Sequence, residues 1–155
     1  MNYEALDEAL EYIEYESVDE AVEYENLSSE DKKHVDDTVE FLEKMGDAVI
    51  KFNQSKKDDK KLGRVKFYFP KNKETLHKKI LNRYRNKFTK WWFGKDVKIC
   101  HGTKKCLNEF YQANSSLINS YCNKYDLVCK IATDSVTYGF IPVYVKSYLV
   151  LRRYR

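Results

Sequence analysis

Glycine and proline are scarce in this chain of 155 residues, with five and two copies, which excludes collagen-like and linker-like proteins. No apolar run approaches the roughly 18 residues that a transmembrane helix needs, so no membrane partner is expected. The N-terminus is acidic, whereas a secretory signal begins with basic residues and an apolar stretch, so we expect a cytoplasmic protein. No catalytic motif occurs anywhere, and we therefore do not expect an enzyme.

Basic residues are absent from the first 31 positions, which we call the acidic segment and which hold 12 Asp and Glu residues. Residues 1–50 carry 17 acids and 3 bases, a net charge of −14, and residues 51–155 carry a net charge of +18. The overall charge of +4 hides this split. A chain so polarised has two separate electrostatic roles, or one half partly neutralises the other.

The acidic half has the periodicity of helices, and its clearest apolar stripe is Val35, Val39, Leu42, Met45 and Val49, behind a cap at Ser28 or Ser29. Residues 55–63 lack this periodicity and mark the boundary between a helical domain, 1–54, and a basic domain, 64–155. In the basic domain we expect a strand at 65–69, a helix at 74–93, a short strand at 97–100, a helix weakened at 114–116, and C-terminal strands in 127–132 and 136–151. The predicted fold class is α+β, with acidic N-terminal helices joined to a basic mixed domain that holds a small antiparallel sheet.

Tyrosines interleave with the carboxylates of the acidic segment, as is typical of binding surfaces. On a helix such carboxylates are spaced like the phosphates of duplex DNA, so the segment is suited to occupy a basic nucleic-acid channel of another protein. The alternatives are an intramolecular contact with the basic half and a merely solubilising surface. The residues predicted to bind a partner are Glu4, Asp7, Glu8, Glu11, Tyr12, Glu14, Tyr15, Glu16, Asp19, Glu20, Glu23 and Glu25.

A basic row, Lys79, Arg83, Lys87 and Lys90, lies in the predicted helix 74–93 at or near a spacing of four residues, among aromatic side chains. Such a row is suited to contact several phosphates, and an exposed Trp beside it could stack on a base. The alternative function is therefore a nucleic-acid-binding module whose basic face is regulated by the acidic segment. The ordinary alternative is that the aromatics are core and the bases face solvent.

Four cysteines, Cys100, Cys106, Cys122 and Cys129, all lie in the second half of the chain. In a cytoplasmic protein this clustering favours structural zinc over disulfides, although zinc knuckles usually have tighter spacing. A site with all four requires a break in the helix that contains 114–116, because an unbroken helix would hold Cys106 and Cys122 about 24 Å apart. A simpler arrangement for such a site places Cys100 and Cys129 on neighbouring strands, with Cys106 and His101 near the same end. Free buried cysteines and catalytic thiols are the alternatives.

A small chain rich in Lys, Asn and Tyr, without enzyme motifs and with an acidic tyrosine-bearing run from Tyr3 to Glu30, resembles the phage-encoded type II-A anti-CRISPR proteins. The resemblance is one of general character, without an aligned motif, and assigns no functional residue. It implies that the protein acts in the bacterial host cell on Cas9 or its guide-RNA complex and hinders recognition or loading of target DNA. Cas9 holds nucleic acid in positively charged channels, which an acidic surface would fit.

Overall fold

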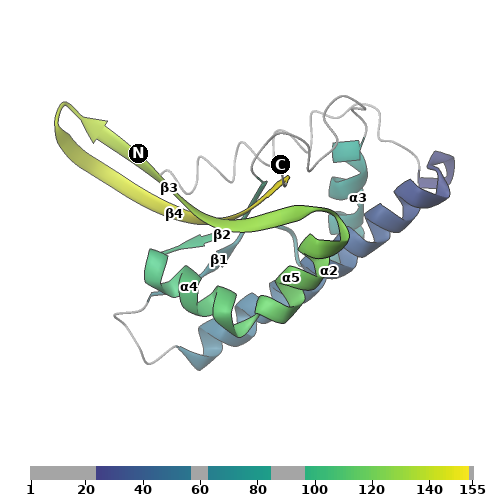
Figure 1. The fold of residues 1–155 in the computed structure, drawn as a ribbon, viewed down its shortest axis with the longest axis horizontal. Coiled ribbons are helices and arrows are strands. Elements are labelled where there is room, and N and C mark those ends of the chain that lie inside the picture. Colours follow the sequence, from purple (N-terminus) through teal and green to yellow (C-terminus); the bar gives the residue numbers. More distant parts are fainter. Residues whose placement is uncertain (1–23, 57–62, 85–96, 154–155) are drawn as a thin grey trace. The chain divides into compact units, whose positions relative to one another are not determined.

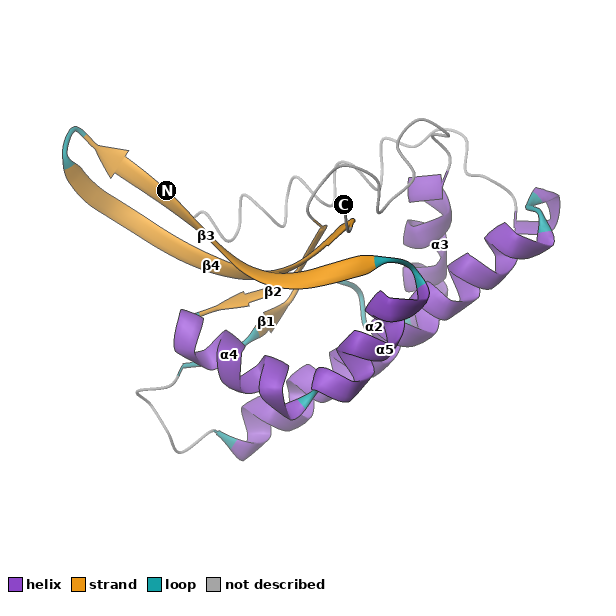
Figure 2. Cartoon of the chain, viewed as in Figure 1, coloured by secondary structure: helices purple, strands orange, loops and turns teal. Residues whose placement is uncertain are grey.

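A computed structural model describes residues 24–56, 63–84 and 97–153 of the chain (Figure 1). Along the sequence the elements are η1 (Tyr24–Asn26), α2 (Ser29–Ser55), β1 (Lys66–Phe67), α3 (Lys73–Tyr84), β2 (Val97–Gly102), α4 (Lys104–Ala113), α5 (Ser115–Lys124), β3 (Leu127–Tyr138) and β4 (Ile141–Arg153). The described residues thus contain α-helices and one four-stranded antiparallel sheet (Figure 2), which confirms the predicted α+β class.

The chain divides into two compact units that are interleaved along the sequence. The described part of the first unit is residues 24–40 and 70–84, and that of the second unit is residues 41–56, 63–69 and 97–153. Helix α2 contributes to both. The predicted domains, 1–54 and 64–155, follow one another instead, and that division stays a prediction.

In the first unit, polar side chains cap both helices at their N-termini. The hydroxyl of Ser28 accepts a hydrogen bond from the backbone N–H of Asp31 at 3.1 Å, which confirms the cap predicted at Ser28 or Ser29. Asn72 caps α3 in the same way, with its side-chain oxygen 3.1 Å from the N–H of Thr75. Helix α3 extends to Tyr84 in the described residues, and the rest of the predicted helix 74–93 lies outside them.

The apolar stripe predicted for the acidic half is buried in the middle of α2. Its members Val35, Val39, Leu42, Met45 and Val49 are each at most 4% exposed, which confirms the stripe. The C-terminal part of this helix packs on α4 and α5 through aromatic pairs. Phe52 meets Phe110 edge-on at 5.5 Å between ring centroids, and Phe41 stacks on Tyr121 at 4.2 Å.

The sheet of the second unit has the strand order β1-β2-β4-β3. Helices α4 and α5 lie on one side of it (Figure 2). Strands β3 and β4 form one hairpin, paired from Leu127 opposite Arg153 to Tyr138 opposite Ile141, and they continue past β2 as a two-stranded ribbon (Figure 1). Gly139 has φ 63° at the first position of the two-residue turn, which a residue without Cβ adopts at low cost.

The break predicted at 114–116 is present. Helix α4 ends at Ala113 and α5 begins at Ser115, with Asn114 between them donating a side-chain hydrogen bond to the carbonyl of Phe110 at 3.0 Å. A hydrogen bond of 2.8 Å from the Tyr111 hydroxyl to the Asn119 side chain joins the two helices across the break.

Strand β3 is longer than the predicted range 127–132, because the polar stretch around Asp134 continues it up to the turn at Gly139, and β4 starts later than the predicted 136, at Ile141. By contrast, the strand predicted at 65–69 has only two paired residues, Lys66 and Phe67.

No helix in the described part of the chain has both the length and the apolar character to cross a membrane.

Gly102 at the end of β2 has no room for a side chain, because a Cβ there would stand 2.9 Å from the backbone carbonyl oxygen of Arg64. We predict that Gly102→Ala lowers the free energy of unfolding by about 1–3 kcal/mol, the usual cost of overpacking a backbone contact. Urea denaturation measures it. Lys104→Ala, two residues on and exposed, is the control and should change stability by less than about 0.5 kcal/mol. Equal stability of the two variants would contradict the close approach.

Candidate functional site

The four cysteines lie in one layer between the sheet and helices α4 and α5. Cys100 on β2 is paired with Leu149, and Cys129 on β3 is paired with Leu151, so both lie on the same face of the sheet with β4 between them. The expectation that their strands are neighbours is therefore wrong, because β4 intervenes. Cys106 lies in the first turn of α4 and Cys122 in the last turn of α5, and both are buried.

Neighbouring thiols lie close enough to raise one another's pKa. The Cys100 thiol is affected by Cys129 and by Cys106, and the Cys129 thiol is affected by Cys122. We call this arrangement, Cys106–Cys100–Cys129–Cys122, the thiol row. All four are free cysteines. The sequence predicts that the cysteines cluster. The order of the thiol row depends on the order of the strands in the sheet, which cannot be deduced from the spacing of the cysteines along the chain.

Burial keeps these thiols protonated. It raises the pKa of Cys100 well above its usual value and that of Cys122 to about 11. Burial and, secondarily, the nearby Cys122 raise the pKa of Cys129 to about 12. The pKa of Cys106 is raised by burial and then by Glu109, while Lys56 lowers it. Since the thiolate is the nucleophile, these cysteines have the character of small core residues rather than of catalytic groups.

Zinc requires thiolates that converge on one point, each about 2.3 Å from the ion. In the part of the chain that the structure describes, no three His, Cys, Asp or Glu side chains are arranged to hold a metal ion. The thiol row as observed does not fit a four-cysteine zinc centre. Structural zinc stays a prediction, and it would require the four thiols to move together around one ion.

Metal analysis of the purified, untagged chain tests that prediction. If Cys100, Cys106, Cys122 and Cys129 hold structural zinc, inductively coupled plasma mass spectrometry should find about one zinc per chain, and chelation should lower the melting temperature. A content far below one zinc per chain contradicts the zinc prediction.

The raised pKa of Cys129 also makes stability depend on pH. In the unfolded chain this thiol ionises near 9.0, whereas in the folded protein it ionises near 12. Above pH 9 the folded state therefore binds more protons, so its stabilisation is complete below pH 9 and is lost as pH rises towards 12.

We predict that the free energy of unfolding of the parent protein falls more steeply between pH 9 and pH 11 than that of Cys129→Ala. The difference should be at most about 1 kcal/mol per pH unit, because the thiol is part-exposed and screened. Thr133→Ala, on the same strand without a titrating group, should keep the parent slope. Identical slopes for all three proteins would contradict the burial of the thiol.

The acidic segment is described only at its C-terminal end. Eleven of the predicted partner-binding residues lie outside the described residues: Glu4, Asp7, Glu8, Glu11, Tyr12, Glu14, Tyr15, Glu16, Asp19, Glu20 and Glu23. Glu25, in η1, is exposed. Further carboxylates, at Glu30, Asp36 and Glu40 of α2, are also exposed, so the acidic surface continues onto this helix.

Tyr24 fastens this end of the acidic segment to the first unit. Its hydroxyl donates a hydrogen bond of 2.7 Å to Asp36, and its ring lies 5.2 Å from that of His77 on α3 and 5.5 Å from the ammonium group of Lys32. The hydrogen bond to Asp36 is the main reason that the pKa of Tyr24 is raised. Tyr24 was not among the predicted site residues, although the tyrosine pattern of the segment includes it.

The basic row is described only in part. Lys79 is 7% exposed in α3, whereas a phosphate contact requires an ammonium group that reaches solvent. Its neighbours on the helix, Leu76 and Ile80, are completely buried, so this part of α3 faces the interior. Arg83 belongs to α3, but its side chain, like Lys87 and Lys90, lies outside the described set. The nucleic-acid contact of this row stays a prediction, without support from Lys79.

A cluster of tyrosine, lysine and histidine side chains that sequence reasoning missed lies on the other face of the sheet. It consists of Tyr68, Lys98, His101, Lys146 and Tyr148, which we call the tyrosine–lysine cluster. The Lys98 ammonium group stands 4.0 Å from the centre of the Tyr148 ring, and that of Lys146 stands 5.3 Å from Tyr148 and 5.6 Å from Tyr68. His101 contacts both tyrosine rings, at 5.1 and 6.2 Å.

Cation–π contacts of this kind are worth about 0.5–2 kcal/mol each when partly desolvated. Lys98 also forms an ion pair of 3.7 Å with Asp134, which extends the cluster onto β3. The sequence signal is an alternation of Lys and Tyr along β4, but the cluster combines residues of β2 and β4 with Tyr68, which follows β1, and these segments are distant in sequence. Tyr68, Lys146 and Tyr148 are buried, so this basic group is a structural feature more than a surface for ligands.

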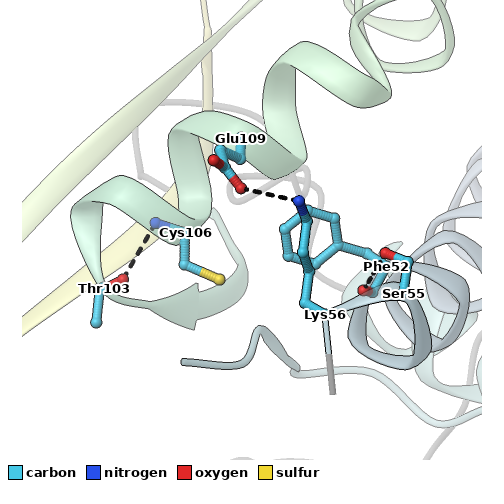
Figure 3. Close-up of polar contacts among 6 residues, drawn as sticks. All are labelled: Phe52, Ser55, Lys56, Thr103, Cys106 and Glu109. Carbon is cyan, nitrogen blue, oxygen red and sulfur yellow. Dashed lines mark hydrogen bonds and ion pairs between the residues drawn. The ribbon is translucent and has the colours of Figure 1, made fainter. Parts of the chain in front are cut away.

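A shallow open groove lies between the end of α2 and helix α4, and Phe52, Ser55, Lys56, Asn108, Glu109, Gln112 and Ala113 line it. Its polar contacts are shown in Figure 3, where Lys56 pairs with Glu109 at 3.5 Å. Nearby, the hydroxyl of Thr103 caps α4 by accepting a hydrogen bond from the N–H of Cys106. Among the described residues that line it, the groove holds one ion pair and no nucleophile–base couple.

Comparison of the chain with protein-family models, with curated proteins and with solved structures finds no match.

Proposed function

We propose that this protein is a non-enzymatic inhibitor of a nucleic-acid-handling protein, and specifically an anti-CRISPR that binds Cas9 or its guide-RNA complex and hinders recognition or loading of target DNA. The observation that carries the proposal is the acidic segment, with 12 carboxylates and no base in 31 residues. Cas9 is chosen as the target because of the resemblance to phage-encoded type II-A inhibitors.

The mechanism is electrostatic occupation of a basic channel. Double-stranded DNA carries one charge per about 1.7 Å of its axis, and a protein that binds it does so largely by neutralising phosphates. A segment of closely spaced carboxylates competes for the same Lys and Arg side chains. In Cas9 the duplex of guide RNA and target DNA lies in a positively charged channel, and a protein segment that occupies this channel would exclude the target DNA.

Two features of the described residues support a surface of this kind. Exposed carboxylates continue beyond the segment on α2, at Asp36 and Glu40. Tyr24 holds the end of the segment against α2 and α3, which lowers the loss of conformational freedom when the segment binds a partner. The buried, protonated thiols also argue against cysteine-based catalysis.

Charge reversal within the segment tests the proposal. We predict that Glu11→Lys, Glu14→Lys, Glu20→Lys and Glu23→Lys together abolish inhibition, since like charges then repel the basic channel. The measurement is protection of a target duplex from cleavage by guide-loaded Cas9, with circular dichroism to establish that the fold is intact. Full inhibition by the folded variant would refute the electrostatic mechanism.

A matched pair of double variants separates the segment from net charge. Glu11→Lys with Glu14→Lys, inside the segment, should weaken inhibition at least tenfold, the effect of losing roughly 1.4 kcal/mol of binding. Asp47→Lys with Glu74→Lys makes the same change in total charge at exposed positions outside it and should leave inhibition unchanged. Equal losses in the two double variants would mean that only net charge matters.

A further inference from the structure

Strand β3 forms one edge of the sheet, and no described strand lies along its outer side. It is 12 residues long, about twice the usual length of a strand, so it presents a long row of backbone N–H and C=O groups at that edge. Proteins commonly protect such edges with proline, several charges or a short strand. The opposite edge strand, β1, has two residues, but β3 has no proline and is charged only at Lys130 and Asp134.

We propose that a second copy of this chain pairs with this edge, β3 against β3, in an antiparallel arrangement about a two-fold axis at Ala132. Two identical strands that meet edge to edge are related by such an axis, and each contributes the same surface. The sheets of the two copies then form one continuous sheet. This inference goes beyond the proposed function and does not depend on it.

Charge complementarity selects the register. With the axis at Ala132, Lys130 of each copy lies opposite Asp134 of the other, and the pairing contains two ion pairs. A shift of the axis to Lys130 or to Asp134 would instead place like charges opposite one another, which destabilises a sheet. Lys130 and Asp134 are both exposed in the single chain, although Asp134 also pairs with Lys98 at 3.7 Å, and Ala132 is small enough to face its own copy at the axis.

The same register accounts for the exposed apolar residues at the tip of the hairpin. Phe140 is 104% exposed and Ile141 is 69% exposed, and residues 134–146 contain no charge between Asp134 and Lys146. With the axis at Ala132, residues 139–141 of one copy lie level with residues 123–125 of the other, at the end of α5. Tyr125, whose ring already contacts Tyr121, is there to pack against the tip.

The first test is the oligomeric state of the full chain by sedimentation velocity, in a concentration series up to about 1 mM, which reaches dissociation constants in the millimolar range. The parent chain should form a dimer. Lys130→Asp should weaken the dimer roughly tenfold, since both ion pairs become repulsive. Lys130→Asp combined with Asp134→Lys should recover most of the dimer, because the charges across the interface are exchanged, while the Lys98–Asp134 ion pair within each copy is lost. Lys104→Asp, exposed on α4, is the control and should leave the dimer unchanged.

The second test is cross-linking at the axis. Opposed residues of an antiparallel pair have Cα atoms about 4.5–5.5 Å apart, within the range of a disulfide. Ala132→Cys should therefore link two copies when diamide takes up the two electrons and two protons of the thiols. Lys130→Cys is the matched control, because residue 130 stands about 13 Å along the strand from its own counterpart and should not cross-link. The parent chain gives the background from its own cysteines.

A dimer that cross-links at residue 132 but not at 130, and that responds to the charge exchange, supports the proposal. A chain that stays monomeric throughout the series overturns it. A dimer that is indifferent to Lys130→Asp, or that cross-links no better at 132 than at 130, also overturns it, since the copies then meet elsewhere.

Discussion

Pairing of β4 with a strand on each side is the interaction on which the second unit depends. Residues 147–151 of β4 are paired with β2, and nearly the whole strand is paired with β3, so the segments at 97–102 and 127–138 reach one sheet only through it. Leu149 and Leu151 of this strand are almost completely buried, together with Phe110 of α4 and Ile118 of α5. The thiol row and the tyrosine–lysine cluster lie on opposite faces of this sheet, so both depend on the same strand pairing.

The two clusters of the second unit have different chemical consequences. Burial raises the pKa of Cys122 and Cys129 on the helix-covered face, so these thiols stay protonated even above pH 9 and behave as core residues. Lysines on the other face rest against tyrosine rings, which compensate for part of the lost hydration. Some lysines of the second half of the chain therefore make contacts within the fold, and these lysines are not available to bind a nucleic acid.

Features set by local periodicity could be predicted, and features set by distant pairing could not. The stripe of α2, the cap at Ser28 and the break at Asn114 each depend on neighbouring residues, and all three are confirmed. Cys100 and Cys129 were expected on adjacent strands, but alternation of side chains does not specify strand order. Lys79 has the spacing of a solvent-facing lysine, and only the tertiary packing of α3 determines that it is buried.

We propose that the acidic segment binds the partner and that much of the basic half has a structural role. Fluorescence anisotropy of a labelled target duplex tests this division most directly, with the protein added in the presence and absence of guide-loaded Cas9. We predict that the protein leaves the anisotropy of the free duplex unchanged and prevents the rise that Cas9 capture causes. Salt-sensitive binding to the free duplex would contradict the account and favour a nucleic-acid-binding module regulated by its acidic segment.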